Sequence, residues 1–357
     1  MKRRRPTLAD IAKRTGFGTN TVSLALRHST RISKATRSTI LAAARDLDYV
    51  PNRVAKALAV DRSNTVGLLL HDITNPSLTR AAKLIQLELA RRGYSVLFAT
   101  SDGNFEEELR AIDVFRSHMI DGLLIYPLIH DRLEHLVELR SKNFPVVLLI
   151  GADEAPLDAV GVDEYRGGYS ATRHLIELGH SHIGLIGGGT VINDEKIRGY
   201  RAALEESGIA FDSARIGLAD SHSIEGGIEA TEHLMTNSPG VTAIFAMSDV
   251  LGLGALRWAA MHKVAVPSKL SIVGFDNNED AQHSFVPLTT YLNDAQALAT
   301  AAVDRLVQLI ESKGELPPPI TKHIEGRVIV RESTRRRPGS SNGGGRGVAR
   351  AKPETID

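Results

Sequence analysis

The length, composition and charge of the chain set the first limits on its function. It has 357 residues, 42% of them apolar and 24% charged, which is ordinary for a soluble globular protein and predicts two or three domains. The sequence contains no cysteine, which excludes disulfides, thiolate metal sites and a cysteine nucleophile and fits a reducing cytoplasm. No apolar run approaches the roughly 20 residues of a membrane span, and the basic start is followed by polar sequence. We therefore expect a cytoplasmic protein without a signal peptide or membrane contact.

The charge is distributed unevenly along the chain. Residues 1–60 contain 13 Lys or Arg and 3 Asp or Glu, whereas residues 61–334 contain 24 and 37, and residues 335–357 contain 6 and 2. A small basic domain on an acidic body favours binding of nucleic-acid phosphates by the first domain. A solvated basic face is the alternative that charge alone leaves open.

The first fifty residues predict three short helices. Thr7 can cap the first helix, with Asp10 as its capping-box partner, and Gly16 can end it. A second helix is expected over residues 19–27, and Ser33 can cap a third.

From residue 65 onward, short apolar runs alternate with amphipathic helical stretches. The predicted strands are 66–70, 96–99, 122–126, 146–150, 183–186, 216–219, 243–246 and 271–275. Repeated β-α-β units with strands that are apolar on both faces predict doubly wound parallel sheets, and about 270 residues of this pattern predict two α/β lobes. The strand 288–292, the helix 293–313 and the strand 323–330 are expected to cross back and complete both sheets.

These patterns predict the following domain organisation. The expected parts are a helix-turn-helix domain at 1–50, a hinge helix and linker at 51–64, a first lobe at 65–162 plus 293–322, a second lobe at 163–292 plus 323–333, and a disordered basic tail at 334–357.

Residues 7–27 carry the strongest functional signal. A helix, a turn containing glycine and a second helix with a polar start form the helix-turn-helix plan, in which the second helix enters the major groove. Thr19 and Asn20 occupy the first turn of that helix, and an Asn amide can pair with adenine N6 and N7. Hydroxyl groups placed for phosphate contacts are those of Thr7, Ser23, Ser33 and Thr36.

Several motifs together closely resemble the lactose/galactose-repressor (LacI/GalR) family of transcription regulators. They are Thr21-Val-Ser23, Ser33 with Thr36-Arg37, the run 47–58, Asp72-Ile-Thr-Asn-Pro76, Asp121-Gly122, His174-Leu175, Leu178-Gly179-His180, Arg198-Gly199-Tyr200, Ser248-Asp249, Gly274-Phe275-Asp276-Asn277 and Pro287-Leu-Thr-Thr290. The likeness extends to Ser333. It implies a sensor of periplasmic-binding-protein-like fold behind the DNA-binding domain, and repression as the commoner mode of action.

The resemblance also extends the set of expected DNA contacts. It adds Thr21, Leu24, Arg31, Asn52 and Leu58, the last as an apolar wedge in the minor groove that kinks the duplex. Leu24 stands where many members have a base-reading Arg, so it should pack on thymine methyls or make no base contact. Gly18 stands where the family usually has a capping Ser.

An effector pocket between the lobes is also implied by the resemblance. The matching positions are Asn75, Ser77, Leu78, Lys196, His222, Ser248, Asp249 and Asp276. Asp276 is expected to accept hydrogen bonds from two sugar hydroxyls, with turn formation by Asp276-Asn277 as the alternative. Asn75-Pro76 can place helix N–H groups at the ligand edge of a sheet, or simply cap the helix. Lys196 replaces a frequent Arg, and His222 replaces a frequent stacking aromatic residue, so the identity of the carbohydrate-like effector stays open.

Enzyme classes lack their sequence signatures. The strand-to-helix junctions carry no dinucleotide fingerprint, P-loop, nucleophile elbow or zinc-protease motif. Gly187-Gly188-Gly189 follows a strand and could approach a phosphate, but a glycine cluster alone is weak evidence for a cofactor site. The 13 histidines lack metal-binding spacing. We therefore expect neither a cofactor nor a metal. The sequence predicts a homodimeric regulator that binds double-stranded operator DNA; a related binding protein that no longer uses DNA and an α/β enzyme are the alternatives.

Overall fold

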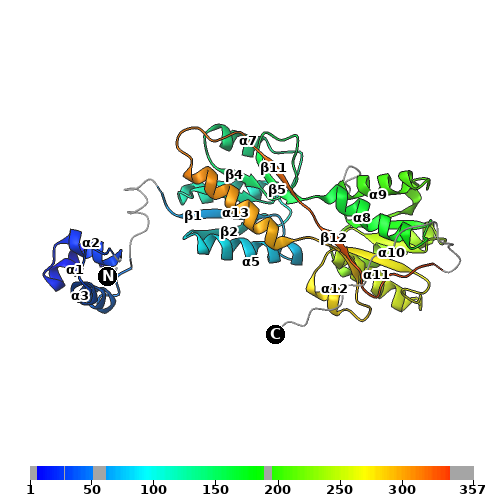
Figure 1. The fold of residues 1–357 in the computed structure, drawn as a ribbon, viewed down its shortest axis with the longest axis horizontal. Coiled ribbons are helices and arrows are strands. Elements are labelled where there is room, and N and C mark those ends of the chain that lie inside the picture. Colours follow the sequence, from blue (N-terminus) through cyan, green and yellow to red (C-terminus); the bar gives the residue numbers. More distant parts are fainter. Residues whose placement is uncertain (1–5, 28, 51–61, 189–194, 338–357) are drawn as a thin grey trace. The chain divides into compact units, whose positions relative to one another are not determined.

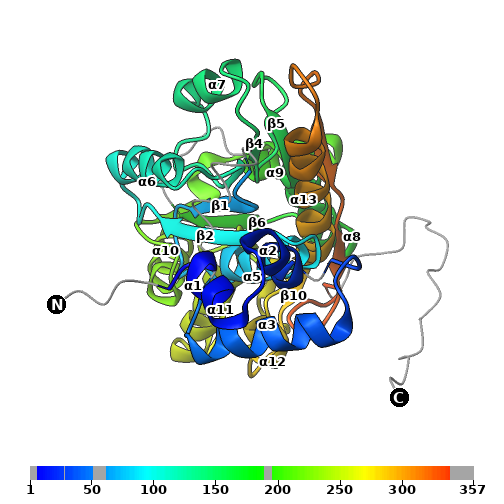
Figure 2. The ribbon, with the colours of Figure 1, turned by 90° about the vertical axis from the view of Figure 1, so that its left-hand side faces the viewer.

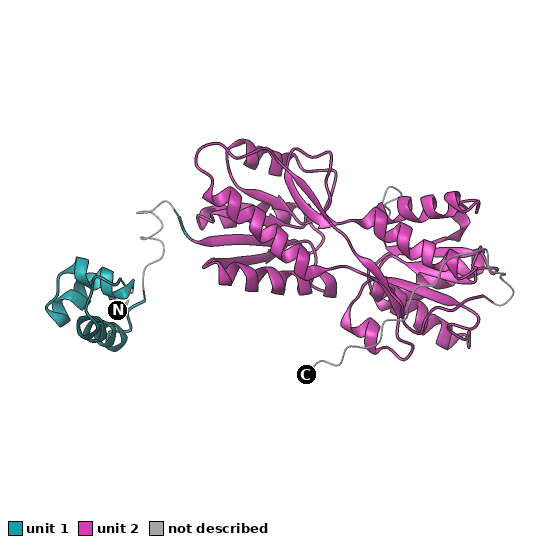
Figure 3. Ribbon diagram, viewed as in Figure 1, with its two compact units in different colours: residues 1–63 teal, residues 64–357 magenta. Residues whose placement is uncertain are grey.

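The computed structural model describes residues 6–27, 29–50, 62–188 and 195–337. The chain divides into two compact units, residues 1–63 and residues 64–357 (Figure 3). They are called the head and the sensor below, and each is described by itself. Within the described residues, every helix is too short or too polar to cross a bilayer.

The described part of the head contains three helices (Figure 1): α1 (Leu8–Thr15), α2 (Thr19–Leu26) and α3 (Lys34–Asp46). The predicted caps are confirmed. Thr7 N donates to Asp10 Oδ2 over 2.7 Å, and Thr36 N donates to Ser33 Oγ over 3.2 Å. Gly16 ends α1 in the left-handed region with φ 74°, where glycine carries no Cβ penalty.

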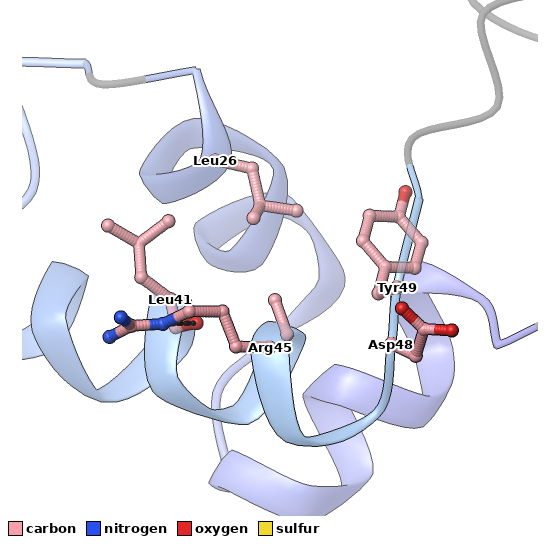
Figure 4. A pocket seen from close by; sticks show the side chains of 6 residues that line it. Leu26, Leu41, Arg45, Asp48 and Tyr49 are labelled. Carbon is pink, nitrogen blue, oxygen red and sulfur yellow. Dashed lines mark hydrogen bonds between the residues drawn. The ribbon is translucent and has the colours of Figure 1, made fainter.

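A small apolar core holds the head together. Its buried members are Ile11, Val22, Ala25, Ile40, Ala43 and Ala44. Arg37 Nη2 donates to Ser29 O over 2.6 Å and thereby ties the loop between α2 and α3 to α3. Figure 4 shows a hollow beside this core, lined by Leu26, Leu41, Ala44, Arg45, Asp48 and Tyr49. The packed part of the head ends just after Tyr49, and the next residue, Val50, is 75% exposed.

The first lobe of the sensor is built on a parallel sheet. Its six described strands are β1 (Thr65–Leu70), β2 (Ser95–Thr100), β3 (Gly122–Ile125), β4 (Val146–Leu148), β5 (Asp158–Val162) and β11 (Thr321–Ile324), in the order β11-β5-β4-β3-β1-β2. Helices α5 (Pro76–Arg91) and α13 (Ala295–Glu311) cover one face of the sheet. Helices α6 (Phe105–Ser117) and α7 (Glu134–Ser141) cover the other face (Figure 2).

The second lobe repeats this plan. Its six described strands are β6 (Ile183–Gly188), β7 (Ile216–Ala219), β8 (Ala243–Ala246), β9 (Ser271–Asp276), β10 (Thr289–Leu292) and β12 (Arg327–Ile329), in the order β12-β10-β9-β8-β6-β7. Helices α8 (Glu164–Glu177) and α9 (Glu195–Glu206) pack on one face. Helices α10 (Ile224–Asn237) and α11 (Asp249–Met261) pack on the other, and the short α12 (Glu279–His283) and the 3₁₀ turn Ser213–Arg215 complete the lobe.

The central strands are apolar because both of their faces are covered. In β1, residues 66–70 are all buried, with side chains alternating between the two helix layers. Position 67 of this strand requires glycine, because a Cβ there would lie 2.7 Å from the ring of Phe115 on α6. Two doubly wound lobes are therefore confirmed as the architecture of the sensor.

The late crossing of the chain between the lobes differs from the prediction. A single strand over 323–330 was expected, but β11 ends at Ile324 in the first sheet and β12 begins at Arg327 in the second. Gly326 N between them donates to Tyr291 Oη over 2.9 Å, which turns the chain onto the second lobe. The expected border at 322/323 therefore falls inside β11, and β12 runs antiparallel to β10 instead of parallel. The pattern also missed β5.

The basic tail begins later than predicted. Thr334 is buried, Arg335 N donates to Ser271 Oγ over 3.2 Å, and Arg337 N donates to Leu178 O over 2.8 Å. Backbone hydrogen bonds thus fix residues 334–337 to the second lobe, although their composition favoured disorder. Residues 338–357 lie outside the described part of the chain.

Candidate DNA-binding surface and candidate effector site

The first turn of α2 presents the predicted base-reading side chains. Gly18 precedes the helix in an extended conformation, and Thr19 and Asn20 follow it with exposed side chains. Thr21, Ser23 and Leu24 are half-buried on the same short helix, whose opposite side contributes Val22 and Ala25 to the core of the head. The core therefore fixes α2 while its polar start faces outward, as major-groove insertion requires.

Of the predicted phosphate-contacting hydroxyls, those of Thr7, Ser33 and Thr36 lie at helix starts, and that of Ser23 lies within α2. Thr7 Oγ1 donates to Asp10 Oδ2 over 2.7 Å at the start of α1, and Ser33 Oγ donates to Thr36 Oγ1 over 2.9 Å at the start of α3. Helix N-termini offer backbone N–H groups to anions, and Arg31 is exposed just before α3. Asn52 and Leu58, the other expected DNA contacts, lie outside the described residues.

The candidate effector residues gather at the carboxyl ends of the sensor strands. Open α/β sheets bind ligands at this edge, where the strand order reverses. Here the order reverses between β1 and β3 and between β6 and β8. His71 follows β1 and Tyr126 follows β3 in the first lobe, Asp276 ends β9 in the second, and Asn293 follows β10 at a crossing between the lobes.

Asp276 is the centre of this group, and the structure connects it to both lobes. Hydrogen bonding by the Ser77 side chain on α5 and by the Asn293 side chain acts to lower the pKa of its carboxyl group. Burial raises the pKa of Asp276 to about 7, the Lys196 ammonium opposes that rise, and Glu164 adds to it. Asp276 also has φ 111°, in a region that non-glycine residues rarely adopt.

A buried hydrogen-bond network holds the strained turn after β9. Asn277 N donates to Thr290 Oγ1 over 3.2 Å, and Asn278 N donates to Asp249 Oδ2 over 2.7 Å. Thr290 Oγ1 donates to the other oxygen of Asp249 over 2.6 Å. Asp249 is completely buried, and burial, followed by the nearby Asp276, raises its pKa to about 8. The geometry therefore gives Asp249 the task of fixing the turn that carries Asp276.

Lys196 and His222 lie on the second-lobe side of the site. Lys196 Nζ is 3.0 Å from Glu164 Oε1 and 4.6 Å from the centroid of the Phe275 ring. Burial acts to raise the pKa of Glu164, but Lys196 outweighs it and the net shift is downward. Burial and then Lys196 lower the pKa of His222, which favours its neutral imidazole. By surface area His222 is an exposed residue, so the effect of burial on it is limited.

The glycines at the end of β6 have a packing role. A Cβ at Gly188 would lie 2.8 Å from the His222 ring, and a Cβ at Gly187 would lie 2.5 Å from Met247 Sδ. The structure therefore explains these two residues of the glycine cluster by the space they leave for neighbouring side chains, without a phosphate.

The first lobe contributes a row of rings that the sequence analysis missed. The ring centroids of His71 and Tyr126 are 4.9 Å apart, and those of Tyr126 and His130 are 5.6 Å apart. Burial lowers the pKa of His71, which keeps its ring neutral at pH 7. The three residues follow or lie just beyond buried strands, and that position at a sheet edge is the signal that could have identified them.

The predicted effector residues divide into two groups. Ser77, Lys196, His222 and Asp276 belong to the site described above. The others make contacts within their own lobe: the Asn75 side chain accepts from Ser77 N over 2.9 Å, Ser248 accepts from Leu251 N over 3.3 Å, and Leu78 and Asp249 are buried. Glu164 and Asn293 join the site without having been predicted. Among the described residues, no group of His, Asp and Glu is arranged to hold a metal ion.

Comparisons with known proteins agree with this division into head and sensor. Residues 7–52 match the bacterial regulatory proteins of the lacI family, and residues 172–334 match a periplasmic binding protein-like domain. The transcriptional regulator DegA of Bacillus subtilis (strain 168) is 35% identical over 291 residues, which cover 80% of this chain and 85% of DegA. The regulator CelR of Thermobifida fusca is 32% identical, over 93% of this chain and 99% of CelR.

Solved structures show the same likeness. A complex of the transcriptional regulator CelR with cellobiose has a TM-score of 0.68 and 30% identity, and covers 92% of this chain and 100% of CelR. The lac repressor dimer bound to operator and the anti-inducer ONPF has a TM-score of 0.82 and 26% identity, and covers 93% and 100% of the two chains. These relatives are transcriptional regulators and not enzymes. With its head, its two-lobed sensor and these matches, the chain belongs to the LacI family of bacterial transcriptional regulators.

Proposed function

We propose that the chain is a repressor that binds operator DNA as a homodimer and is controlled by a carbohydrate-like effector held between the lobes of its sensor. The observation that carries this proposal is the arrangement of Asp276, which combines a strained backbone with hydrogen bonds from Ser77 of the first lobe and from Asn293. A ligand that replaces Ser77 or Asn293 at the Asp276 carboxyl would change the contacts that connect the two lobes.

The chemistry of the site favours a ligand rich in hydroxyl groups. The Asp276 carboxylate can accept two hydroxyl hydrogen bonds, and Asn293 Oδ1 is buried with no partner among the described residues. The neutral rings of His71, Tyr126 and His222 offer flat surfaces against which the apolar face of a sugar can pack. The CelR relative was solved with cellobiose, so cellobiose is the first probe to use.

The head supplies the operator contacts in this proposal. Two copies of α2 presented by a dimer would contact two half-sites about one helical turn apart, which predicts a pseudopalindromic operator. The lac repressor neighbour was solved as a dimer on operator. The effector controls binding only if it has different affinities for the DNA-bound and free states of the protein.

Selection of binding sites from random duplex DNA tests the proposal directly. The full-length protein should enrich a two-fold-symmetric sequence, and fluorescence anisotropy with that duplex should then show an affinity that changes with cellobiose or another sugar of a panel. Enrichment of no sequence, with attraction that disappears uniformly as salt rises, would leave only non-specific phosphate binding and contradict the proposal.

A further inference from the structure

Helix α5 of the first lobe makes a second contact with the second lobe, one turn beyond Ser77. Arg80 Nη1 donates to the backbone carbonyl oxygen of Asn277 over 3.1 Å. Asn277 lies in the turn after β9, next to Asp276. Two consecutive residues of one turn are thus bound by two side chains of one helix, Asp276 by Ser77 and Asn277 by Arg80.

The acceptor of Arg80 is held rigidly. Asn277 has φ 57°, its N–H donates to Thr290 Oγ1 over 3.2 Å, and its Oδ1 accepts from Arg331 Nη2 over 2.5 Å. A turn fixed at so many points cannot follow α5 if the lobes separate. The bond between Arg80 and Asn277 therefore depends on the relative position of the two lobes.

The two contacts differ in what an effector does to them. A ligand hydroxyl that binds the Asp276 carboxylate can take the place of the Ser77 side chain, since both would donate to that carboxyl group. The acceptor of Arg80 is the backbone carbonyl of Asn277, so a ligand hydroxyl that binds the Asp276 carboxylate does not take up this acceptor. Arg80 can therefore hold the lobes together both before and after the ligand enters.

We propose that Arg80 is a positioning residue that latches the first lobe onto the Asn277 carbonyl and so sets the affinity for the effector without touching it. The proposal rests on the proposed function insofar as the effector binds at Asp276. Arg80 has an exposed side chain, so its bond competes with water and its contribution is modest. We expect its removal to weaken effector binding about fivefold, the lower end of typical couplings between sites.

The first test measures the lobes without any ligand. The chain contains no cysteine, so Glu106→Cys on α6 and Glu229→Cys on α10, both at exposed positions, give one spin label on each lobe. Dilution with unlabelled protein restricts the measured distances to pairs within one protomer. Double electron–electron resonance should show a shift of the label distances to longer values when Arg80→Ala is added. Lys83→Ala is the matched control, because Lys83 is an exposed cation one turn further along α5. Equal distance distributions for Arg80→Ala and the parent would overturn the latch.

The second test measures effector binding by calorimetry with cellobiose and the sugar panel. For the sugar that binds the parent, Arg80→Ala should raise the Kd about fivefold. Lys83→Ala should leave it unchanged, and Arg80→Ala should unfold at the same temperature as the parent. An unchanged Kd with Arg80→Ala would contradict the positioning role. If no sugar binds the parent, the proposed effector class fails, while the label distances still decide whether Arg80 latches the lobes.

Discussion

The head and the effector site solve the problem of recognition in opposite ways. The head presents its candidate base contacts within the eight residues of α2, and the first of them, Thr19 and Asn20, are exposed. The effector site draws its residues from positions 71 to 293 and ties most of them to other protein groups. Substitutions at the exposed start of α2 should therefore change binding without changing stability, whereas substitutions around Asp276 should change both.

The largest expected effect tests the rigidity of the effector site. Asp249→Ala removes the acceptor of Thr290 Oγ1 and Asn278 N inside the second lobe. Leaving these buried donors without a partner should lower the free energy of unfolding of the sensor by about 3 kcal/mol. Chemical denaturation followed by the single tryptophan, Trp258 on α11, measures it.

Asp249→Asn is the matched control for that substitution. Burial raises the pKa of Asp249 to about 8, so the carboxyl is mostly protonated at pH 7 and, like an amide, carries one hydrogen-free oxygen. Asn can keep that oxygen for Asn278 N, and the Thr290 hydroxyl can rotate to accept from the amide nitrogen. We expect Asn to cost less than about 1 kcal/mol. Equal losses for Ala and Asn, or no loss for either, would show that the turn does not depend on this network.

The second prediction concerns acid sensitivity of the sensor. Burial lowers the pKa of His174 from 6.5 to about 4, and its Nε2 lies 3.1 Å from Thr334 Oγ1. Above pH 6.5 the ring is neutral in both the folded and the unfolded chain, so this contribution is constant. Between pH 6.5 and pH 4 the unfolded chain takes up a proton on this ring that the folded chain does not, so His174 contributes a loss of stability of about 2 kcal/mol. The raised pKa values of Asp249 and Asp276 act in the opposite direction, so the His174 contribution is read from the difference between the parent and a His174 variant.

Denaturation curves collected at pH 7, 6, 5 and 4 check this dependence. His174→Gln should lose less stability than the parent as the pH falls from 7 to 4. His180, whose pKa burial also lowers, keeps part of that loss in the variant. If His174→Gln lost as much stability as the parent between pH 7 and pH 4, His174 would not contribute to the acid sensitivity of the sensor.

The third prediction tests the head. Asn20→Ala should weaken binding to the selected operator about tenfold, because a bidentate contact to a base contributes about 1–3 kcal/mol of discrimination. Binding to random duplex DNA and the unfolding transition should stay the same, since the side chain is exposed. A uniform loss on all duplexes would indicate that Asn20 contacts phosphates instead of a base.

The smallest expected change is one of preference. Leu24 is half-buried on α2, one turn after Asn20. Leu24→Arg should change the selected operator at one position, since Arg pairs with guanine and Leu at most packs on thymine methyls. If the wild type and Leu24→Arg selected indistinguishable sites, that result would contradict a base-facing position for this residue.

The sequence predicted what local chemistry determines. Caps at Thr7 and Ser33, the break at Gly16 and the strands that are buried on both faces follow from patterns within a few residues. The split between β11 and β12 did not, because it depends on Tyr291 meeting Gly326 across the fold. Glu164 and Asn293 also escaped prediction, since only the folded lobes bring them to Lys196 and Asp276.

Residues with two roles were the hardest to assign from sequence. Ser248 and Asp249 match family motifs, and the fold uses them to cap α11 and to hold a turn. Whether such a residue faces a ligand depends on its burial, which a single sequence does not contain.

The central claim is that a ligand at Asp276 controls binding of DNA by α2, and one measurement tests it most directly. Operator affinity should be compared for the parent and Asp276→Ala, each with and without the sugar that alters the parent. The account predicts an operator affinity that changes with the sugar in the parent and does not change with it in Asp276→Ala. A response of the same size in Asp276→Ala would contradict it.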